Sequence, residues 1–295
     1  MLRVSPFVLL ALLSVLMAGT ASAQNRTLTT PEVSPHARVQ QAVGLTDLSV
    51  EYHRPAVRGR VIFGGLEPFG EVWRSGANEN TVFETSTDIR VEGETLPAGR
   101  YGLHTIPGET EWTVIFSTMA DAWGSYSYDP AEDALRVAVV ARDAPLAERL
   151  LYRFDAPTTD SATLVLHWAE TEVPVAITVD TPSVVLESME RELRGIPGFF
   201  WEGWNQIAQY ALDNNRRLGD AMEWVETSIA RQPTFANRMT QAGLLAAMGQ
   251  ETEAAEIRED AHTMASPEEV RAWARARQRA GFAQQAQTAL DRLGG

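Results

Sequence analysis

The sequence predicts a protein of the β + α class: an antiparallel β-sandwich or jelly-roll-like domain followed by an α-helical, tetratricopeptide-like array. Two observations carry this prediction. Apolar and polar residues alternate in runs between residues 48 and 179, which is the pattern of strands with one buried face. Beyond residue 204, small residues and prolines recur every 34 residues, the period of tetratricopeptide helical hairpins. We therefore expect the chain to change from strands to helices near residue 180.

The first 23 residues have the layout of a cleavable secretory signal. Arg3 precedes an apolar run from Phe7 to Met17, and small residues follow up to Ala23. This run is shorter than the about 20 residues that span a bilayer, and no later apolar run is longer. We therefore expect an exported protein, periplasmic or extracellular, with no integral membrane segment after cleavage. An uncleaved membrane anchor is the alternative.

The composition excludes several kinds of chemistry. All 25 cationic side chains are arginines and the chain has no cysteine, so Schiff-base, pyridoxal and thiol chemistry are excluded, as are disulfides. The formal net charge of −14 becomes −15 once the signal with Arg3 is removed. Such an acidic surface repels nucleic acid, whose phosphates require a basic surface. We expect no cofactor and no nucleic-acid partner.

The roughly 270 residues after the signal divide into four stretches. An N-terminal segment, 24–46, precedes the β-sandwich domain at 47–180. We expect eight or nine short strands there, separated by turns at 91–94, 97–99, 107–109, 128–130 and 155–157. A helix with Thr181 as N-cap and Pro182 as its first residue begins the linker, 181–203, which continues through glycine, proline and aromatic residues. The helical domain occupies 204–295.

Three registers in the last 92 residues support the helical array. The residues that recur at 34-residue spacing are Ala208, Ala242 and Ala276; Ala221, Ala255 and Ala289; and Pro233 and Pro267. In tetratricopeptide repeats, small residues let two helices approach closely and a proline ends the second helix. We expect the array to bind a protein or peptide partner, and an ordinary α-hairpin bundle is the alternative.

Aromatic, cationic, amide and acidic residues are concentrated in residues 62–81 and in later turns. The candidate ligand contacts are Trp73, Arg74, Asn78, Glu79, Arg54, His104, Trp123 and Tyr126. Forked guanidinium donors and flat rings suit a small polar or glycan-like ligand. A plug at the open end of the sandwich is the alternative role of Trp73. Arg58 and Arg60 are expected to pair internally with nearby glutamates: Glu67, Glu71 and Glu79.

No established catalytic motif is present, so the catalytic residues are unassigned. The zinc-hydrolase, nucleophile-elbow and dinucleotide patterns are absent, and Ser125 lacks the second glycine of an elbow. The alternative to a binding protein is an envelope hydrolase acting on glycans or peptides through carboxylates such as Glu71 and Glu79. A metal held by His53 and His104 would serve the same purpose. Structural roles are the simpler interpretation of both histidines.

Several segments resemble an exported bacterial family known as domain of unknown function 2911. They are 52–55 (YHRP), 59–60 (GR), 62–66 (IFGGL), 73–79 (WRSGANE), 97–99 (PAG), Tyr101, 105–108 (TIPG) and 123–126 (WGSY). The resemblance covers about residues 35–180 and implies an exported β-rich domain, without an established activity or cofactor. His53 stands where many members have a small residue. The leading hypothesis is a cell-envelope module that binds a ligand or serves as a scaffold, with a helical protein-interaction domain.

Overall fold

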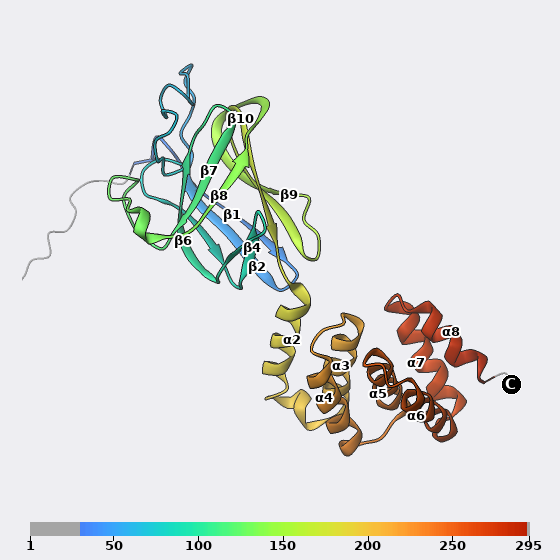
Figure 1. Ribbon diagram of the computed structural model, residues 1–295. Helices are drawn as coiled ribbons and strands as arrows, with labels where there is room; N and C mark the ends of the chain where they lie inside the picture. Colours follow the sequence, from blue (N-terminus) through green and yellow to red (C-terminus); the bar gives the residue numbers. More distant parts are fainter. Residues whose placement is uncertain (1–29, 294–295) are drawn as a thin grey trace, which may run out of the picture.

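The computed structural model describes residues 30–293, which form a β domain and a helical domain joined by the helix α2 (Figure 1). The predicted signal peptide, 1–23, lies outside the described residues. Among the residues described, no helix combines the length and the apolar character needed to cross a membrane. The strands are β1 (His36–Val43), β2 (Thr46–His53), β3 (Thr81–Thr85), β4 (Ile89–Val91), β5 (Glu94–Leu96), β6 (Gly99–Ile106), β7 (Glu111–Ser117), β8 (Asp133–Val140), β9 (Arg142–Asp155) and β10 (Ser161–Thr178).

The β domain consists of two sheets in which all paired strands are antiparallel. The larger sheet has the order β1-β2-β3-β6-β7-β8, and the smaller has the order β5-β4-β10-β9. One hydrophobic cluster takes side chains from both sheets, including Phe83, Trp112, Phe116, Leu164, Trp168 and Ile177. The predicted antiparallel β domain followed by helices is confirmed at this level.

The alternating runs form strands with one buried face, as predicted. Leu48, Val50 and Tyr52 lie in β2 and belong to the shared cluster. The runs beginning at Trp112 and Val173 lie in β7 and β10 and are buried in the same way. All five predicted turns lie between strands or at their ends. Apolar periodicity therefore located these strands correctly.

Two features of the sheets differ from the expectation. The described residues form ten strands, and β9 and β10 are 14 and 18 residues long rather than short. In addition, β1 lies within the segment 24–46 and pairs with β2 along its whole length, so the sheet starts before residue 47. Its sequence, HARVQQAV, gives a weak apolar signal because it is an edge strand with mostly exposed or half-buried side chains.

The long hairpin of β9 and β10 is irregular on both sides of Ala169, where the pairing register shifts and φ is 52°. Between the shifts, residues 148–150 of β9 pair with the chain that follows β2. The Val57 N–H donates to the Glu148 carbonyl at 2.7 Å, and the Leu150 N–H donates to the Pro55 carbonyl at 3.0 Å. The irregularity thus anchors the start of the β2–β3 connection on the smaller sheet.

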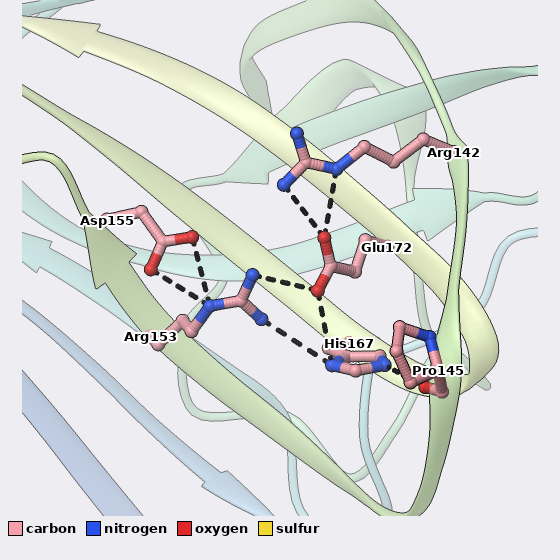
Figure 2. A network of polar contacts seen from close by, with 6 residues as sticks. All are labelled: Arg142, Pro145, Arg153, Asp155, His167 and Glu172. Atoms are coloured by element: carbon pink, nitrogen blue, oxygen red, sulfur yellow. Dashed lines mark hydrogen bonds and ion pairs between the residues drawn. The ribbon is translucent and has the colours of Figure 1, made fainter.

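A charged network spans the same hairpin (Figure 2). The largely buried Glu172 carboxylate accepts hydrogen bonds from Arg142 Nε at 2.9 Å and from Arg153 Nη2 at 2.8 Å. His167 lies beside it, with Nδ1 3.3 Å from Glu172 Oε1, and its Nε2–H donates to the Pro145 carbonyl at 2.9 Å. These contacts hold the two strands together where the regular ladder is interrupted.

The helix α2 (Thr181–Glu192) leaves the β domain directly after β10. Asp180 is its N-cap, and Thr181 is its first residue, so the predicted cap was wrong by one position. The Thr181 hydroxyl instead donates to the Thr159 carbonyl at 2.8 Å. Its side chain also packs on Gly44, where an added Cβ would lie 2.6 Å from Thr181 Cγ2. This close approach joins the β1–β2 turn to the start of the helix.

Six helices in three packed pairs follow a short 3₁₀ turn, η2 (Ile196–Phe199). The helices are α3 (Trp201–Asp213), α4 (Leu218–Arg231), α5 (Phe235–Ala247), α6 (Glu251–Met264), α7 (Pro267–Arg279) and α8 (Ala283–Asp291). The pairs are α3 with α4, α5 with α6, and α7 with α8. The sequence thus predicted the helical character of this region and its division into hairpins.

The strict 34-residue register does not hold in the structure. Ala276 and Ala255 are exposed, and Ala274 and Ala254 are buried in their place. The reason is that α5 begins 34 residues after α3, whereas α7 begins 32 residues after α5. Pro267 also starts α7 rather than ending the preceding helix.

Candidate functional site

The connection between β2 and β3 places most of the predicted site residues at one end of the β domain. Within it, residues 61–67 form a tight turn in which the Leu66 and Glu67 amides donate to the carbonyls of Val61 and Ile62. Ile62 is buried, and Phe63 packs edge-on against Trp112 at 4.6 Å between ring centroids. These apolar anchors fix the turn and leave Glu67 half-buried at its margin.

Trp73 belongs to the core and not to an open site. Its side chain is 5% exposed and stacks on Trp168 with a centroid distance of 5.6 Å. The indole N–H donates to the Gly76 carbonyl at 3.1 Å, and the backbone exchanges two 2.8 Å hydrogen bonds with Thr105. A ligand cannot reach this ring without displacing the core, so Trp73 acts as the plug that was its alternative role.

Arg74 lies on the opposite side of the chain from Trp73. Its Nη1 donates to the Asn78 carbonyl, and its guanidinium carbon lies 5.6 Å from the centre of the Tyr126 ring. Gly124 packs against the guanidinium: φ is +68° there, and an added Cβ would lie 2.7 Å from Arg74 Nη1. Ser75 and Asn78 both have positive φ. The turn is therefore a constrained frame that holds one cation against an aromatic ring.

His104 forms a close pair with Ser125. It alternates with Tyr101 and Leu103 of β6, which face the shared core, so His104 lies on the outer face of the larger sheet. The ring is 2% exposed, and Nδ1 lies 2.9 Å from Ser125 Oγ. Burial lowers the pKa of His104 to about 4; Asp133 acts against this change and Arg74 adds to it. His104 is consequently neutral near pH 7.

Tyr128 and Asp133 support His104 from the next strand. The Tyr128 ring lies 5.3 Å from the His104 ring, and its hydroxyl donates to Asp133 Oδ2 at 2.7 Å. Arg136 donates to both Asp133 and Tyr128. Burial and the hydrogen bond to Asp133 raise the pKa of Tyr128 to about 12, so the phenol keeps its proton and fixes one carboxylate oxygen.

Glu67 is the most perturbed carboxyl group on this side of the domain. Burial raises its pKa to about 7, although the positive charges of Arg74 and Arg60 act in the other direction. Arg60 itself is occupied by backbone, because its guanidinium donates to the carbonyls of Val57 and Ala56. No donor among residues 30–293 forms a hydrogen bond with the Glu67 carboxyl. A half-buried acid without a partner is typical of a functional site.

Two aromatic side chains on the loop between β7 and β8 stand in solvent beside these groups. Trp123 is 60% exposed and Tyr126 is 84% exposed. The loop is tied to the β2–β3 connection, since the Asn80 N–H donates to the Ala122 carbonyl at 3.2 Å. We call the set Glu67, Arg74, His104, Ser125 and Tyr126 the outer-face site.

The remaining predicted residues lie elsewhere or at the margin. Arg54 Nε donates to the Leu150 carbonyl at 2.9 Å, which commits it to the smaller sheet. Glu79 is exposed, with Oε2 3.6 Å from His53 Nδ1. The expected pairing of Arg60 with a glutamate was wrong, because the backbone carbonyls of its own turn are closer at hand. The Arg58 N–H donates to Glu148, a partner from β9.

The two histidines considered for a metal make separate contacts. His53 Nε2 lies 3.0 Å from Glu32 Oε2, and its ring packs edge-on against His36. His104 contacts Ser125 on a strand that β3 separates from β2. Within the described range, no three His, Asp or Glu side chains are grouped so that they could hold a metal ion. Glu71 and Glu79 are both exposed, and no contact in that range joins them.

Sequence reasoning missed part of the outer-face site. Glu67 was considered only as a partner for arginine, and its burial results from a turn that apolar periodicity cannot describe. Ser125 was set aside for lack of an elbow motif, whereas its partner His104 lies 21 residues away on a neighbouring strand. The available signal was the cluster of tyrosines and glycine around Ser125.

The fold and the site are those of a two-sheet β domain with a polar, aromatic-rimmed site on an outer face. Residues 34–177 match the model of the family described as protein of unknown function (DUF2911). This match confirms the family resemblance for the β domain, and the helical domain lies outside it. No curated protein and no solved structure is significantly similar to the chain.

Proposed function

We propose that the chain is an exported binding protein whose outer-face site holds a small, uncharged polar ligand of the glycan type. The observation that carries this proposal is the half-buried Glu67 carboxyl, which has no hydrogen-bond partner among the described residues and a pKa of about 7. The two sheets serve as the layers of a sandwich-like scaffold, and the helix pairs serve as a tetratricopeptide-like array.

The polar groups of the site match a ligand rich in hydroxyl groups. Near pH 7 the Glu67 carboxyl is present both protonated and ionised, so it can donate as well as accept hydrogen bonds. Arg74 supplies further guanidinium donors, because only Nη1 is bound to the Asn78 carbonyl. The exposed rings of Trp123 and Tyr126 offer flat apolar faces. The opposite charges of Arg74 and Glu67 favour an uncharged ligand.

Binding of soluble oligosaccharides to the mature protein tests the proposal. A glycan array identifies the ligand, and titration calorimetry compares Tyr126→Ala and Glu67→Gln with the exposed control Glu71→Gln. We expect the first two variants to lose at least about tenfold in affinity, since each removed contact is worth about 1.5 kcal/mol. Equal affinity for all three variants, or no glycan bound by the wild type, would contradict the proposal.

A groove on the helical domain supports the second part of the proposed function, the docking of an extended, basic peptide. The groove has a volume of about 870 Å³ and lies against α3, α5 and α7; its lining includes Trp201, Asn205, Tyr210, Phe235 and Trp273. Asn205 Oδ1 is buried and has no donor among the described residues. A peptide N–H would satisfy this amide oxygen.

The charge of the groove selects the peptide. Glu202, Asp213 and Glu269 line it, and its only cationic lining residue, Arg277, is paired with Asp213 at 2.7 Å. We expect Asn205→Ala to weaken the binding of peptides selected from a random library and to leave the melting temperature unchanged. Selected peptides that are acidic, or that bind the variant equally well, would refute this part of the proposal.

Ester or amide hydrolysis is the second candidate for the outer-face site. The 2.9 Å contact between His104 Nδ1 and Ser125 Oγ favours it. However, a histidine with a pKa of about 4 is a weak base at neutral pH, so binding is the better supported function. Covalent labelling of Ser125 by an organophosphorus fluoridate, detected by mass spectrometry, would establish hydrolysis; absence of labelling supports the binding function.

A further inference from the structure

A second cavity lies inside the helical domain, apart from the groove. It has a volume of about 180 Å³ and is lined by side chains from α3, α5, α6, α7 and α8. Apolar side chains, including Leu212, Met239 and Trp273, form much of its wall. A dry protein cavity of about 150 Å³ holds a molecule the size of benzene. This cavity can therefore hold one small organic molecule.

The charged groups in its lining all have the same sign. Arg258 and Arg292 line the cavity together with His262, and no aspartate or glutamate does so. The rest of the protein makes this selection notable, because 39 acids and 25 arginines give the whole chain a net charge of −14. A cavity with two guanidinium groups and no carboxylate favours an anion.

His262 and Arg258 have unused hydrogen-bonding capacity within the described part of the chain. His262 Nδ1 lies 2.8 Å from the Arg258 carbonyl, which makes Nδ1 the donor. Its Nε2 is buried and has no partner. The Arg258 guanidinium makes no hydrogen bond or ion pair with a described residue, whereas Arg292 is paired with Glu259 at 3.3 Å. These two groups are therefore available to an occupant.

We propose that this cavity binds a small carboxylic acid whose apolar part is about the size of a benzene ring. The carboxylate pairs with the Arg258 guanidinium, and a carboxylate oxygen lies near His262. The apolar part packs between Met239 and Trp273. Inorganic phosphate does not fit this arrangement, because it offers nothing to the apolar wall and costs more to remove from water.

Titration calorimetry with benzoate and phenylacetate on the mature protein tests the proposal. We expect saturable binding of at least one acid, at least tenfold weaker binding of benzamide, and no binding of inorganic phosphate. Arg258→Gln should lower the affinity at least tenfold. Arg271→Gln, which removes an exposed arginine of α7, should leave the affinity unchanged.

A second measurement keeps the test decisive if Arg258→Gln is unstable. Intermolecular nuclear Overhauser effects should connect the bound ring protons to the Met239 methyl group in the wild-type protein. The proposal is overturned if neither acid binds saturably at millimolar concentration, if a folded Arg258→Gln binds as tightly as the wild type, or if the contacts fall on another surface. Binding of phosphate with benzoate affinity would also overturn it, since the apolar wall would then have no role.

Discussion

Replacement of Glu67 by glutamine should make the β domain more stable at alkaline pH and leave it unchanged in acid. In the unfolded chain this carboxyl ionises at its ordinary pKa of 4.5, whereas in the folded domain it ionises at about 7 because it is buried. Between these values the folded state holds a proton that the unfolded state has lost. The stability of the wild type therefore falls as the pH rises from about 4.5 to about 7.

The size of the effect follows from the same two values. A rise from 4.5 to about 7 corresponds to about 3 kcal/mol above pH 7. Glu67 is only half-buried, so screening by water reduces the expected effect to about 1–2 kcal/mol. For a domain of this size, that is an increase of about 3–8 °C in the midpoint of thermal unfolding at pH 8.

Differential scanning calorimetry of the mature protein at pH 4.5 and pH 8 measures this difference. Glu71→Gln, at an exposed position in the same connection, is the matched control and should change neither midpoint. Carbon-13 NMR titration of the glutamate carboxyls gives the pKa directly, because the Glu67 resonance is the one that the variant lacks. A Glu67 pKa near 4.5, or an equal gain in stability at both pH values, would refute the reasoning.

Three further substitutions test the packing. Glu172→Gln should destabilise the β domain by about 1–2 kcal/mol at neutral pH, a modest loss because its partners Arg142 and Arg153 are 55% and 32% exposed. Burial alone would raise the pKa of Glu172, but the hydrogen bonds from both arginines lower it overall, so the loss in stability should diminish as the pH falls below 4.5; a loss that persists in acid would argue against the ion pairs. Gly102→Ala should raise hydrogen exchange in residues 118–132, because its Cβ would lie 2.6 Å from the Met119 carbonyl; unchanged exchange would show that the loop packs less closely. Gly243→Ala should lower the melting temperature of the helical domain through a 2.6 Å approach to Leu212 Cδ2, whereas Gly219→Ala, with nothing within 4 Å, should raise it by about 0.5–1 kcal/mol; the reverse order would contradict the packing of α3 on α5.

Strands with a clear apolar alternation were predictable because the signal is local. Val50 and Phe116 are buried by the pleat of their own strands. In contrast, β1 carries few large apolar residues and gains its place by pairing with β2. The 34-residue register failed at Ala276 because loop lengths decide which face of α7 is buried, and a repeat in the sequence does not fix them.

The sequence by itself determined the β + α order, the position of the turns, the lack of lysine and cysteine chemistry, and the concentration of polar and aromatic residues near Arg74. These are local properties of composition and period. Only the tertiary structure decided that Trp73 lies in the core and that Arg54 serves the smaller sheet. It alone brought His104 to Ser125 and buried Glu67 without a partner. These outcomes depend on contacts between residues far apart in the chain, which composition and period do not encode.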